Sequence, residues 1–265
     1  MKKILVPTDF SDNALQALLY AVSLAKHTGA AITIYHVFRT GLSERMDGYV
    51  RQSGEEQIDG LIQRIQPTLE GGASVNGVVI QGEPVDSILD RTARQTYDLV
   101  VMGTEGETGI KGFLVGSVTL EVIRRTRQPV LAIPVNAKLT LPQRMIFALD
   151  DQGISTTGVL RPLREIAAAF DAEVKIYHQG REVKTVVPDL LVDEALDGLR
   201  HSFHQEASEE EVWESILQYT LDQKGDLLCL IRRERGLLER LFHHSVTREE
   251  LSSSPVPLLI LHDAH

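Results

Sequence analysis

The chain has 265 residues, of which 43% are hydrophobic and 24% charged, a globular composition with length enough for two domains. Its net charge of −10 argues against wholesale binding to nucleic acid or to an anionic membrane. The single cysteine, Cys229, excludes an intrachain disulfide and suits a reducing compartment. Because the opening MKKILVPTDF is not a signal-peptide pattern and no apolar run approaches the ~18 residues of a membrane span, we expect a cytoplasmic protein.

The first half of the chain alternates short apolar segments with helical patterns. Residues 2–7 predict a strand, Ser11 or Asp12 is a candidate N-cap for the helix that follows, and Gly29 is its expected end. Further strands are expected over 31–37, 75–80, 99–102 and 130–133, and further helices over 53–70, 85–96 and 117–126. Nearly all residues of the central strands are apolar, which indicates a parallel sheet covered on both faces. In such sheets, ligands bind beyond the carboxyl ends of the strands.

An internal repeat divides the chain. The segment 98–134 aligns without a gap on 226–262, a match too long to be expected by chance. Earlier in each half, AAITIYHVF at 30–38 resembles AEVKIYHQG at 172–180, and the alignment places Asp150 opposite Asp9. The sequence therefore predicts two tandem α/β units, each with a five-stranded parallel sheet. Their expected limits are residues 1–137 and residues 143–265.

A glycine-rich stretch joins the fourth strand of the first half to the next helix. Its residues follow the pattern Gly103-x2-Gly106-x9-Gly116-Ser117. Glycine lets backbone amides approach a ligand closely, and a helix N-terminus favours negative charge, so this arrangement suits phosphate groups. A surface loop with an N-cap serine is the alternative, since the pattern is neither a Walker A loop nor GxGxxG.

With this stretch, the chain resembles a tandem universal stress protein. The family's nucleotide signature, Gly-x2-Gly-x9-Gly-Ser/Thr, is matched at every fixed position of 103–117. The first strand runs into Asp9, the second ends in His36-Val37, and the closing Pro-Val-Leu-x-x-Pro occupies 129–134. The resemblance covers the whole first unit and, more weakly, the second. It implies a Rossmann-like fold similar to the adenine nucleotide alpha hydrolases, with the two units packed as a pseudo-dimer.

The resemblance also implies a site for ATP in the first unit. In the ATP-binding members, an aspartate and a valine of the second strand hold the adenosine part, and the glycine loop holds the phosphates. Carried over, the nucleoside pocket is lined by Pro7, Thr8, Asp9 and Val37. Ribose and phosphates are contacted by Gly103, Gly106, Gly116, Ser117 and Val118, with Met102 beneath. Mg²⁺ or Mn²⁺ is expected to accompany the phosphates. A helix cap is the alternative role for the aspartate.

The second unit departs from the signature. The three glycines are replaced, in order, by Ile231, Glu234 and His244. Their side chains would enter the space of the phosphates, and Glu234 adds a like charge, so we expect no ATP in this unit. The arginines beside them either hold another anion or lie in a solvated loop, and the solvated loop is the favoured interpretation; they are Arg232, Arg233 and Arg235.

Three weaker signals occur in the second unit. His201-x-x-His204 could place two imidazoles on one helix face as a metal pair, but an exposed helix without metal is the simpler interpretation. Cys229 aligns with Val101 in a buried strand and is expected in the core. Trp213 lies in an amphipathic pattern and is expected to pack against the unit's interior.

The resemblance implies a stress-response signalling module whose nucleotide state alters contacts with unidentified protein partners. The sequence places no general base to activate water, so any hydrolysis of ATP is expected to be slow, and no catalytic or metal-ligating residue is assigned. Two alternatives stay open. One is a slow ATPase or a nucleotidyl-transferring enzyme that uses Asp9, Thr8 or Ser117, and the other is a structural adaptor without nucleotide. A single pseudo-dimeric chain and a homodimer of such chains are both compatible with the sequence.

Overall fold

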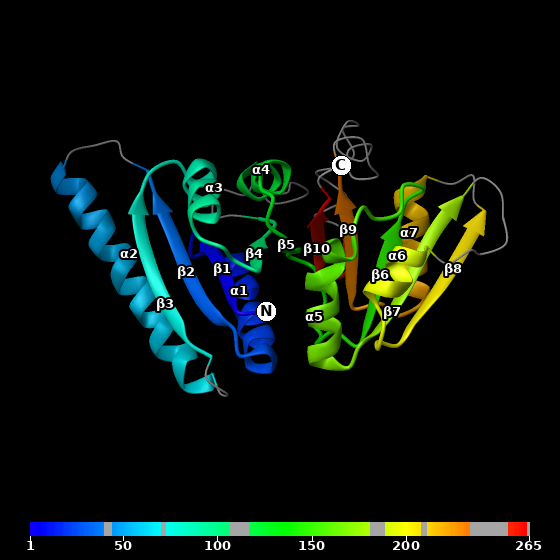
Figure 1. Cartoon of the computed structure of the whole chain (residues 1–265). Coiled ribbons are helices and arrows are strands. Elements are labelled where there is room, and N and C mark those ends of the chain that lie inside the picture. The colour runs from blue at the N-terminus through cyan, green and yellow to red at the C-terminus, as the bar shows by residue number, and fades with distance from the viewer. Residues whose placement is uncertain are drawn as a thin grey trace. The chain divides into compact units, whose positions relative to one another are not determined.

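The computed structural model describes residues 1–39, 44–69, 73–105, 117–180, 189–207, 211–233 and 254–263. The chain divides into two compact units, Met1–Val135 and Asn136–His265, whose helices and strands are labelled in Figure 1. In the described part of the chain, no helix combines the length and the apolar character needed to cross a membrane. The cytoplasmic location and the pseudo-dimer stay predictions.

The first unit is built on five parallel strands in the order β3-β2-β1-β4-β5. Their bounds are β1 Lys3–Thr8, β2 Ala31–Phe38, β3 Val75–Gln81, β4 Leu99–Gly103 and β5 Val130–Ile133. β1 is central, because it pairs with β2 on one side and with β4 on the other. The chain direction across the sheet reverses at β1, so the crevice in which such folds bind ligands lies at its carboxyl end.

The helices of the first unit cover both faces of this sheet (Figure 1). They are α1 Asp12–Thr28, α2 Glu44–Ile65 with the short 3₁₀ turn η1 Gln66–Thr68, α3 Pro84–Arg94 and α4 Ser117–Arg125. Successive residues of β2 contact different layers. The Tyr35 hydroxyl donates to the Ser87 carbonyl of α3 at 3.3 Å, whereas a Cβ at Gly54 of α2 would lie 3.1 Å from Cδ2 of His36. The predicted two-sided cover is therefore confirmed.

Helix α1 begins and ends where its sequence predicts. Ser11 is the N-cap, and its Oγ accepts a hydrogen bond from the Ala14 amide at 3.2 Å. Gly29 is the C-cap with φ 70°, a left-handed conformation that glycine adopts without steric cost. Between these caps, Leu18, Ala21 and Ala25 are buried at spacings of three and four residues, which place them on one face of the helix.

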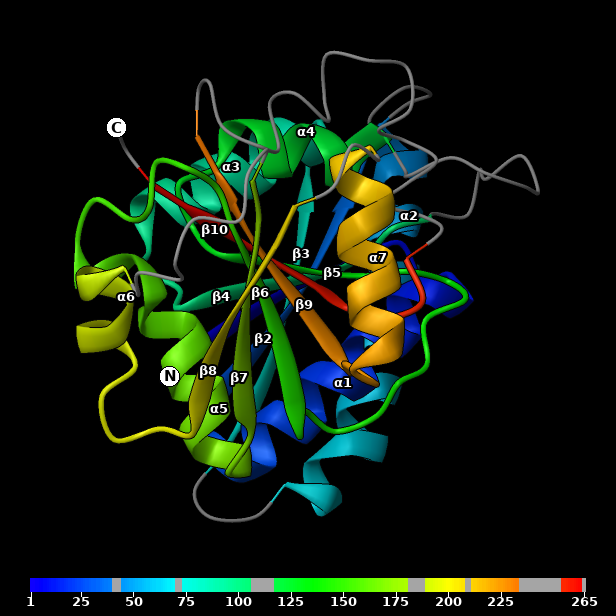
Figure 2. The same cartoon turned by 90° about the vertical axis from the view of Figure 1, so that its right-hand side faces the viewer.

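The second unit repeats the same strand order, β8-β7-β6-β9-β10, again with parallel pairing. Its strands are β6 Arg144–Leu149, β7 Glu173–Gly180, β8 His201–Ala207, β9 Leu227–Arg232 and β10 Leu258–His262. Its described helices are η2 Thr157–Leu160, α5 Arg161–Phe170, α6 Leu190–Ala195 and α7 Val212–Asp222. Figure 2 shows α5 and α7 on opposite sides of these strands.

Matched hydrogen bonds confirm the repeat at the level of single residues. At the amino end of β1, the Asp98 carboxylate accepts from the amides of Lys2 and Lys3 at 2.7 and 3.0 Å. In the second unit, Asp226 accepts in the same way from Gln143 and Arg144. Burial raises the pKa of Asp226, although these amides and the Arg144 charge oppose the increase.

Two predicted elements need correction. The helix expected over 53–70 spans Glu44–Ile65 and is followed by the 3₁₀ turn η1. Its first turns were missed because Met46 and Tyr49 are exposed, so no apolar stripe marks the start. His201 and His204 lie in strand β8, so the expected helix is wrong and their side chains point to opposite faces. His201 Nε2 contacts Asp193 Oδ1 at 2.9 Å, and among the described residues no group of three potential metal ligands is found.

The other two weak signals are confirmed as core residues. Trp213 in α7 is 4% exposed and Cys229 in β9 is completely buried. Both therefore contribute to the interior of the second unit rather than to a reactive surface.

We expect the Cys229 thiol to be unreactive in the folded protein. Burial raises its pKa well above the usual value, so the nucleophilic thiolate is scarce as well as inaccessible. A chromogenic thiol reagent should therefore label the chain only after it is unfolded in guanidinium chloride. The chain has one cysteine, so the absorbance change has a single source. Labelling of the native protein as fast as of the unfolded protein would contradict this placement.

Candidate functional site

The carboxyl edge of the first unit's sheet holds most of the predicted nucleotide residues. Pro7 and Thr8 end β1, and Asp9 follows them directly. From the neighbouring strands and α4 come Val37 near the end of β2, Met102 and Gly103 at the end of β4, and Ser117 and Val118 at the start of α4. Gly106 and Gly116 fall outside the described residues. Segments that are far apart in sequence thus converge on one edge.

Asp9 lies in the turn that joins β1 to α1. Its Oδ1 accepts a hydrogen bond from the Ser11 amide at 3.1 Å, and Thr8 Oγ1 accepts one from the Phe10 amide at 3.0 Å. Ser11 itself caps α1, so Asp9 shapes the turn that precedes the helix rather than its first turn. The two side-chain oxygens fix the backbone conformation around the carboxylate.

The end of β4 requires a glycine because α1 packs directly on it. A Cβ at Gly103 would lie 2.5 Å from Asn13 Oδ1 and 2.9 Å from Asn13 Cγ, closer than side chains tolerate. The buried Asn13 amide group donates to the Ile133 carbonyl at 3.1 Å and accepts from the Glu105 amide at 2.9 Å. This asparagine therefore joins α1, β5 and the beginning of the glycine-rich stretch.

The helix that follows the glycine-rich stretch is hydrogen-bonded back to Gly103, where the stretch begins. Thr119, in the first turn of α4, donates its hydroxyl to the Gly103 carbonyl at 2.7 Å. Ser117, at the start of that helix, is exposed. Sequence reasoning missed the role of Asn13, although a polar residue on the buried face of an apolar helix was a usable signal. The start of α4 is therefore exposed at Ser117 and is linked through Thr119 to Gly103, the residue on which α1 packs closely. A helix N-terminus in this setting suits an anionic group.

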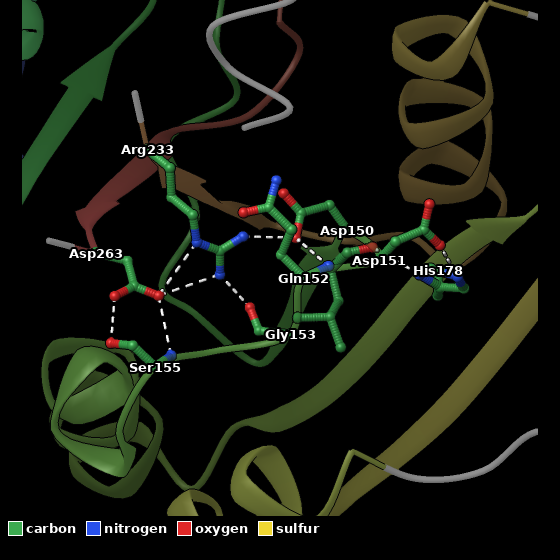
Figure 3. Close-up of polar contacts among 9 residues, drawn as sticks. Asp150, Asp151, Gln152, Gly153, Ser155, His178, Arg233 and Asp263 are labelled. Carbon is green, nitrogen blue, oxygen red and sulfur yellow. Dashed lines mark hydrogen bonds and ion pairs between the residues drawn. The ribbon is translucent and has the colours of Figure 1, made fainter. Parts of the chain in front are cut away.

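The corresponding edge of the second unit holds a buried ion-pair cluster, shown in Figure 3. Arg233, directly after β9, has a side chain that is 3% exposed. Its Nη1 donates to Asp150 Oδ1 at 2.5 Å, and its Nε and Nη2 donate to Asp263 Oδ2 at 3.2 and 3.1 Å. Nη2 also donates to the Gly153 carbonyl. The guanidinium thus joins the ends of β6, β9 and β10.

Asp263 is held as a carboxylate within this cluster. Its side chain is 1% exposed, and burial alone raises its pKa. Hydrogen bonds from the Ser155 amide and hydroxyl, together with the hydrogen bonds and charge of Arg233, outweigh that effect and lower the pKa below its ordinary value. The site therefore keeps two carboxylates around one guanidinium.

Both sequence interpretations of Arg233 are wrong. Its charge is taken up by two carboxylates, so it does not hold a separate anion, and it is buried rather than solvated. Arg232 ends β9, and Arg235 lies outside the described residues. The missed partner was Asp263, an acidic residue after the last strand where the aligned position of the first unit is Val135.

Comparisons with known proteins agree with this architecture. A family model described as the universal stress protein family matches residues 1–134. Universal stress protein MJ0531 of Methanocaldococcus jannaschii is 30% identical over 141 residues, which cover 50% of this chain and 81% of that protein. Universal stress protein YxiE of Bacillus subtilis is 30% identical over 144 residues, which cover 49% of this chain and 97% of that protein.

The similarity in fold extends over nearly the whole chain. The crystal structure of a universal stress protein from Archaeoglobus fulgidus aligns with a TM-score of 0.77 and covers 98% of this chain and 96% of its own. Because the two sequences are 20% identical, this match shows a shared fold alone.

Replacing Arg233 is expected to destabilise the second unit strongly. Arg233→Ala leaves Asp150 and Asp263 buried without their cation, a loss of about 3–5 kcal/mol in unfolding free energy. Urea unfolding followed by the fluorescence of Trp213, the only tryptophan of the chain, reports on this unit. Arg164→Ala on the exposed face of α5 is the control, with an expected change within about 0.5 kcal/mol. Equal losses of unfolding free energy in Arg233→Ala and Arg164→Ala would show that the ion-pair cluster does not stabilise the unit.

The same cluster predicts an acid-sensitive second unit. Because the folded-state pKa of Asp263 is lowered, its contribution is complete above the unfolded-state value of about 3.9 and is lost as the pH falls through the lower folded-state pKa. Asp263→Asn should therefore lower stability at pH 7 and reduce the further loss seen below about pH 4. Urea midpoints from pH 7 to pH 3 measure both effects. Parallel pH profiles for the two proteins would rule out an ionised Asp263 as their source.

Proposed function

The chain belongs to the universal stress protein family, and from this premise we propose that its first unit binds ATP at the carboxyl edge of β1, β2 and β4. One observation carries the proposal: the described residues among those assigned to the nucleotide come from separate strands and the start of α4, and they lie at the crevice where the strand order reverses. The proposed ligand state would regulate contacts with other proteins in a stress response.

The nucleoside end of the proposed site is formed by Asp9, Val37 and Met102. The carboxylate can accept hydrogen bonds from ribose hydroxyls, and charged acceptors make the stronger hydrogen bonds. Its turn is already fixed by hydrogen bonds from the Ser11 and Phe10 amides, so little conformational freedom remains to be lost on binding. Met102, 4% exposed, supplies an apolar surface beneath the ligand.

The phosphate end is formed by the glycine-rich stretch and the start of α4. The stretch leaves from Gly103 and reaches a helix whose Thr119 hydrogen-bonds back to the Gly103 carbonyl, so both of its ends have fixed supports. The exposed Ser117 can donate to a phosphate oxygen at the positive end of the helix dipole. No cluster of three carboxylate, imidazole or thiol ligands occurs in the described ranges, so Mg²⁺ or Mn²⁺ would be held chiefly by phosphate oxygens and water.

We propose that the second unit binds no ATP. Its equivalent of Asp9, Asp150, is already engaged by Arg233, and the buried Ile231 replaces the glycine that ends β4. With one guanidinium and two carboxylates, the cluster carries a net negative charge that repels a polyphosphate. Nucleotide is thereby confined to the first unit.

Thermal melting of the nucleotide-stripped protein tests the proposal. ATP with Mg²⁺ should raise the melting midpoint of the first unit, since a ligand at about 100 times its dissociation constant adds roughly 2.7 kcal/mol to native stability. Gly116→Trp should abolish the rise by filling the phosphate position, whereas the matched His244→Trp, at the aligned position of the second unit, should leave it intact. A rise that survives Gly116→Trp and is lost in His244→Trp would reverse the assignment, and no rise at millimolar ATP would favour the adaptor.

Phosphate release separates binding from catalysis. We expect the wild-type chain with ATP and Mg²⁺ to release phosphate far more slowly than the 1–10³ s⁻¹ typical of enzymes. A rate in that range, lost in Gly116→Trp, would establish the ATPase instead.

A further inference from the structure

Phe10 adopts a backbone conformation that its side chain disfavours. Its φ is 65°, and it is the one described non-glycine residue of the first unit with a positive φ. The left-handed region is sparsely populated by bulky residues, and residues held in it cluster at functional sites. Phe10 lies directly between Asp9 and the N-cap Ser11, so the strained residue borders the proposed nucleoside site.

Two contacts hold this conformation. The Phe10 amide donates to Thr8 Oγ1 at 3.0 Å, and its ring lies against the His36 imidazole with 4.4 Å between ring centroids and 40° between planes. The imidazole is itself fixed, because its Nδ1 lies 2.8 Å from the Thr8 carbonyl, which can only accept, so Nδ1 carries the proton. His36 also lies close to Gly54 of α2. Phe10 is therefore clamped between its own turn and the hydrogen-bonded ring of His36.

The second unit keeps the histidine but not the clamp. His178 Nδ1 lies 3.0 Å from the Leu149 carbonyl, as in the first unit. The residue aligned with Phe10 is Asp151, which has no positive φ and places its carboxylate 3.3 Å from His178 Nε2 (Figure 3). The preceding Asp150 is bonded to Arg233. The strained aromatic turn thus occurs in the unit proposed to bind nucleotide and is absent from the unit whose aspartate is otherwise engaged.

We propose that Phe10 is a positioning residue of the ATP site, whose clamped left-handed backbone holds the Asp9 carboxylate toward the nucleoside. The proposal rests on the proposed function of the first unit. A relaxed turn would redirect the chain between Asp9 and Ser11 and change the direction of the carboxylate. The phosphates, bound by the glycine-rich stretch, would be unaffected. The clamp therefore acts on the nucleoside part of the ligand alone.

Calorimetric titration with two ligands tests this separation. Phe10→Gly permits the left-handed backbone but removes the ring, so the turn is no longer held. We expect ATP with Mg²⁺ to bind at least about tenfold more weakly, the loss that follows when one hydrogen bond to a charged group is misaligned. Binding of inorganic tripolyphosphate with Mg²⁺ should not change. Phe10→Tyr, which keeps the ring, should restore most of the ATP affinity.

His36→Ala removes the clamp from the other side and covers the case in which Phe10→Gly does not fold. It should also weaken ATP and spare tripolyphosphate, and Asp151→Ala, the matched control in the second unit, should change neither. Equal ATP affinity in wild type, Phe10→Gly and His36→Ala would overturn the role of Phe10 and leave ATP binding standing. Equal losses for ATP and tripolyphosphate would overturn it too, as a general disturbance of the unit. If wild type binds no ATP, both proposals fall.

Discussion

Parallel pairing of the central strand with two neighbours determines where function can reside in each unit. β1 pairs with β2 and β4, and β6 pairs with β7 and β9, so three carboxyl ends lie side by side in each sheet. The backbone groups beyond those ends have no further strand to pair with and must find other partners. In the first unit they find Thr8, Asp9 and Asn13, whose side chains accept from the amides of the turns. The chemistry of the edge follows from which side chains supply these bonds.

The two units supply hydrogen-bond partners at the carboxyl ends of their strands with different arrangements of charge. In the first, the end of β4 is closed by small and neutral groups: glycine, with an asparagine and a threonine hydrogen-bonded around it. In the second, a guanidinium links three strand ends through carboxylates. Burying charges is costly unless each one is paired, and here each of the three guanidinium nitrogens donates to an acceptor. The same strand arrangement thus carries hydrogen bonds from neutral side chains at the end of β4 and a buried ion-pair cluster at the end of β9.

The sequence predicted what depends on local pattern. Apolar runs located the strands, Ser11 and Gly29 located the ends of α1, and the ungapped repeat predicted the second sheet. It could not predict contacts between segments that only folding brings together. Asn13 and Glu105 are 92 positions apart, and Arg233 and Asp263 are 30 apart. His201 and His204 were misread because a spacing of three suits a helix only where a helix forms. The arginine run was visible, but not which arginine would be buried.

The cluster around Arg233 also constrains which amino-acid substitutions the second unit can accept during evolution. Relative to the first unit it involves an arginine at the position of Glu105 and an aspartate at the position of Val135, and the arginine pairs with both this aspartate and the shared aspartate Asp150. Removing Arg233 alone leaves two buried carboxylates without their cation, and removing Asp263 alone leaves the guanidinium with one carboxylate in place of two, so each single loss is expected to destabilise the unit. Restoring the first unit's residues at these positions would therefore need coordinated substitutions and not a series of separately tolerated steps. The energetics of a single guanidinium therefore tie three positions of the second unit to one another.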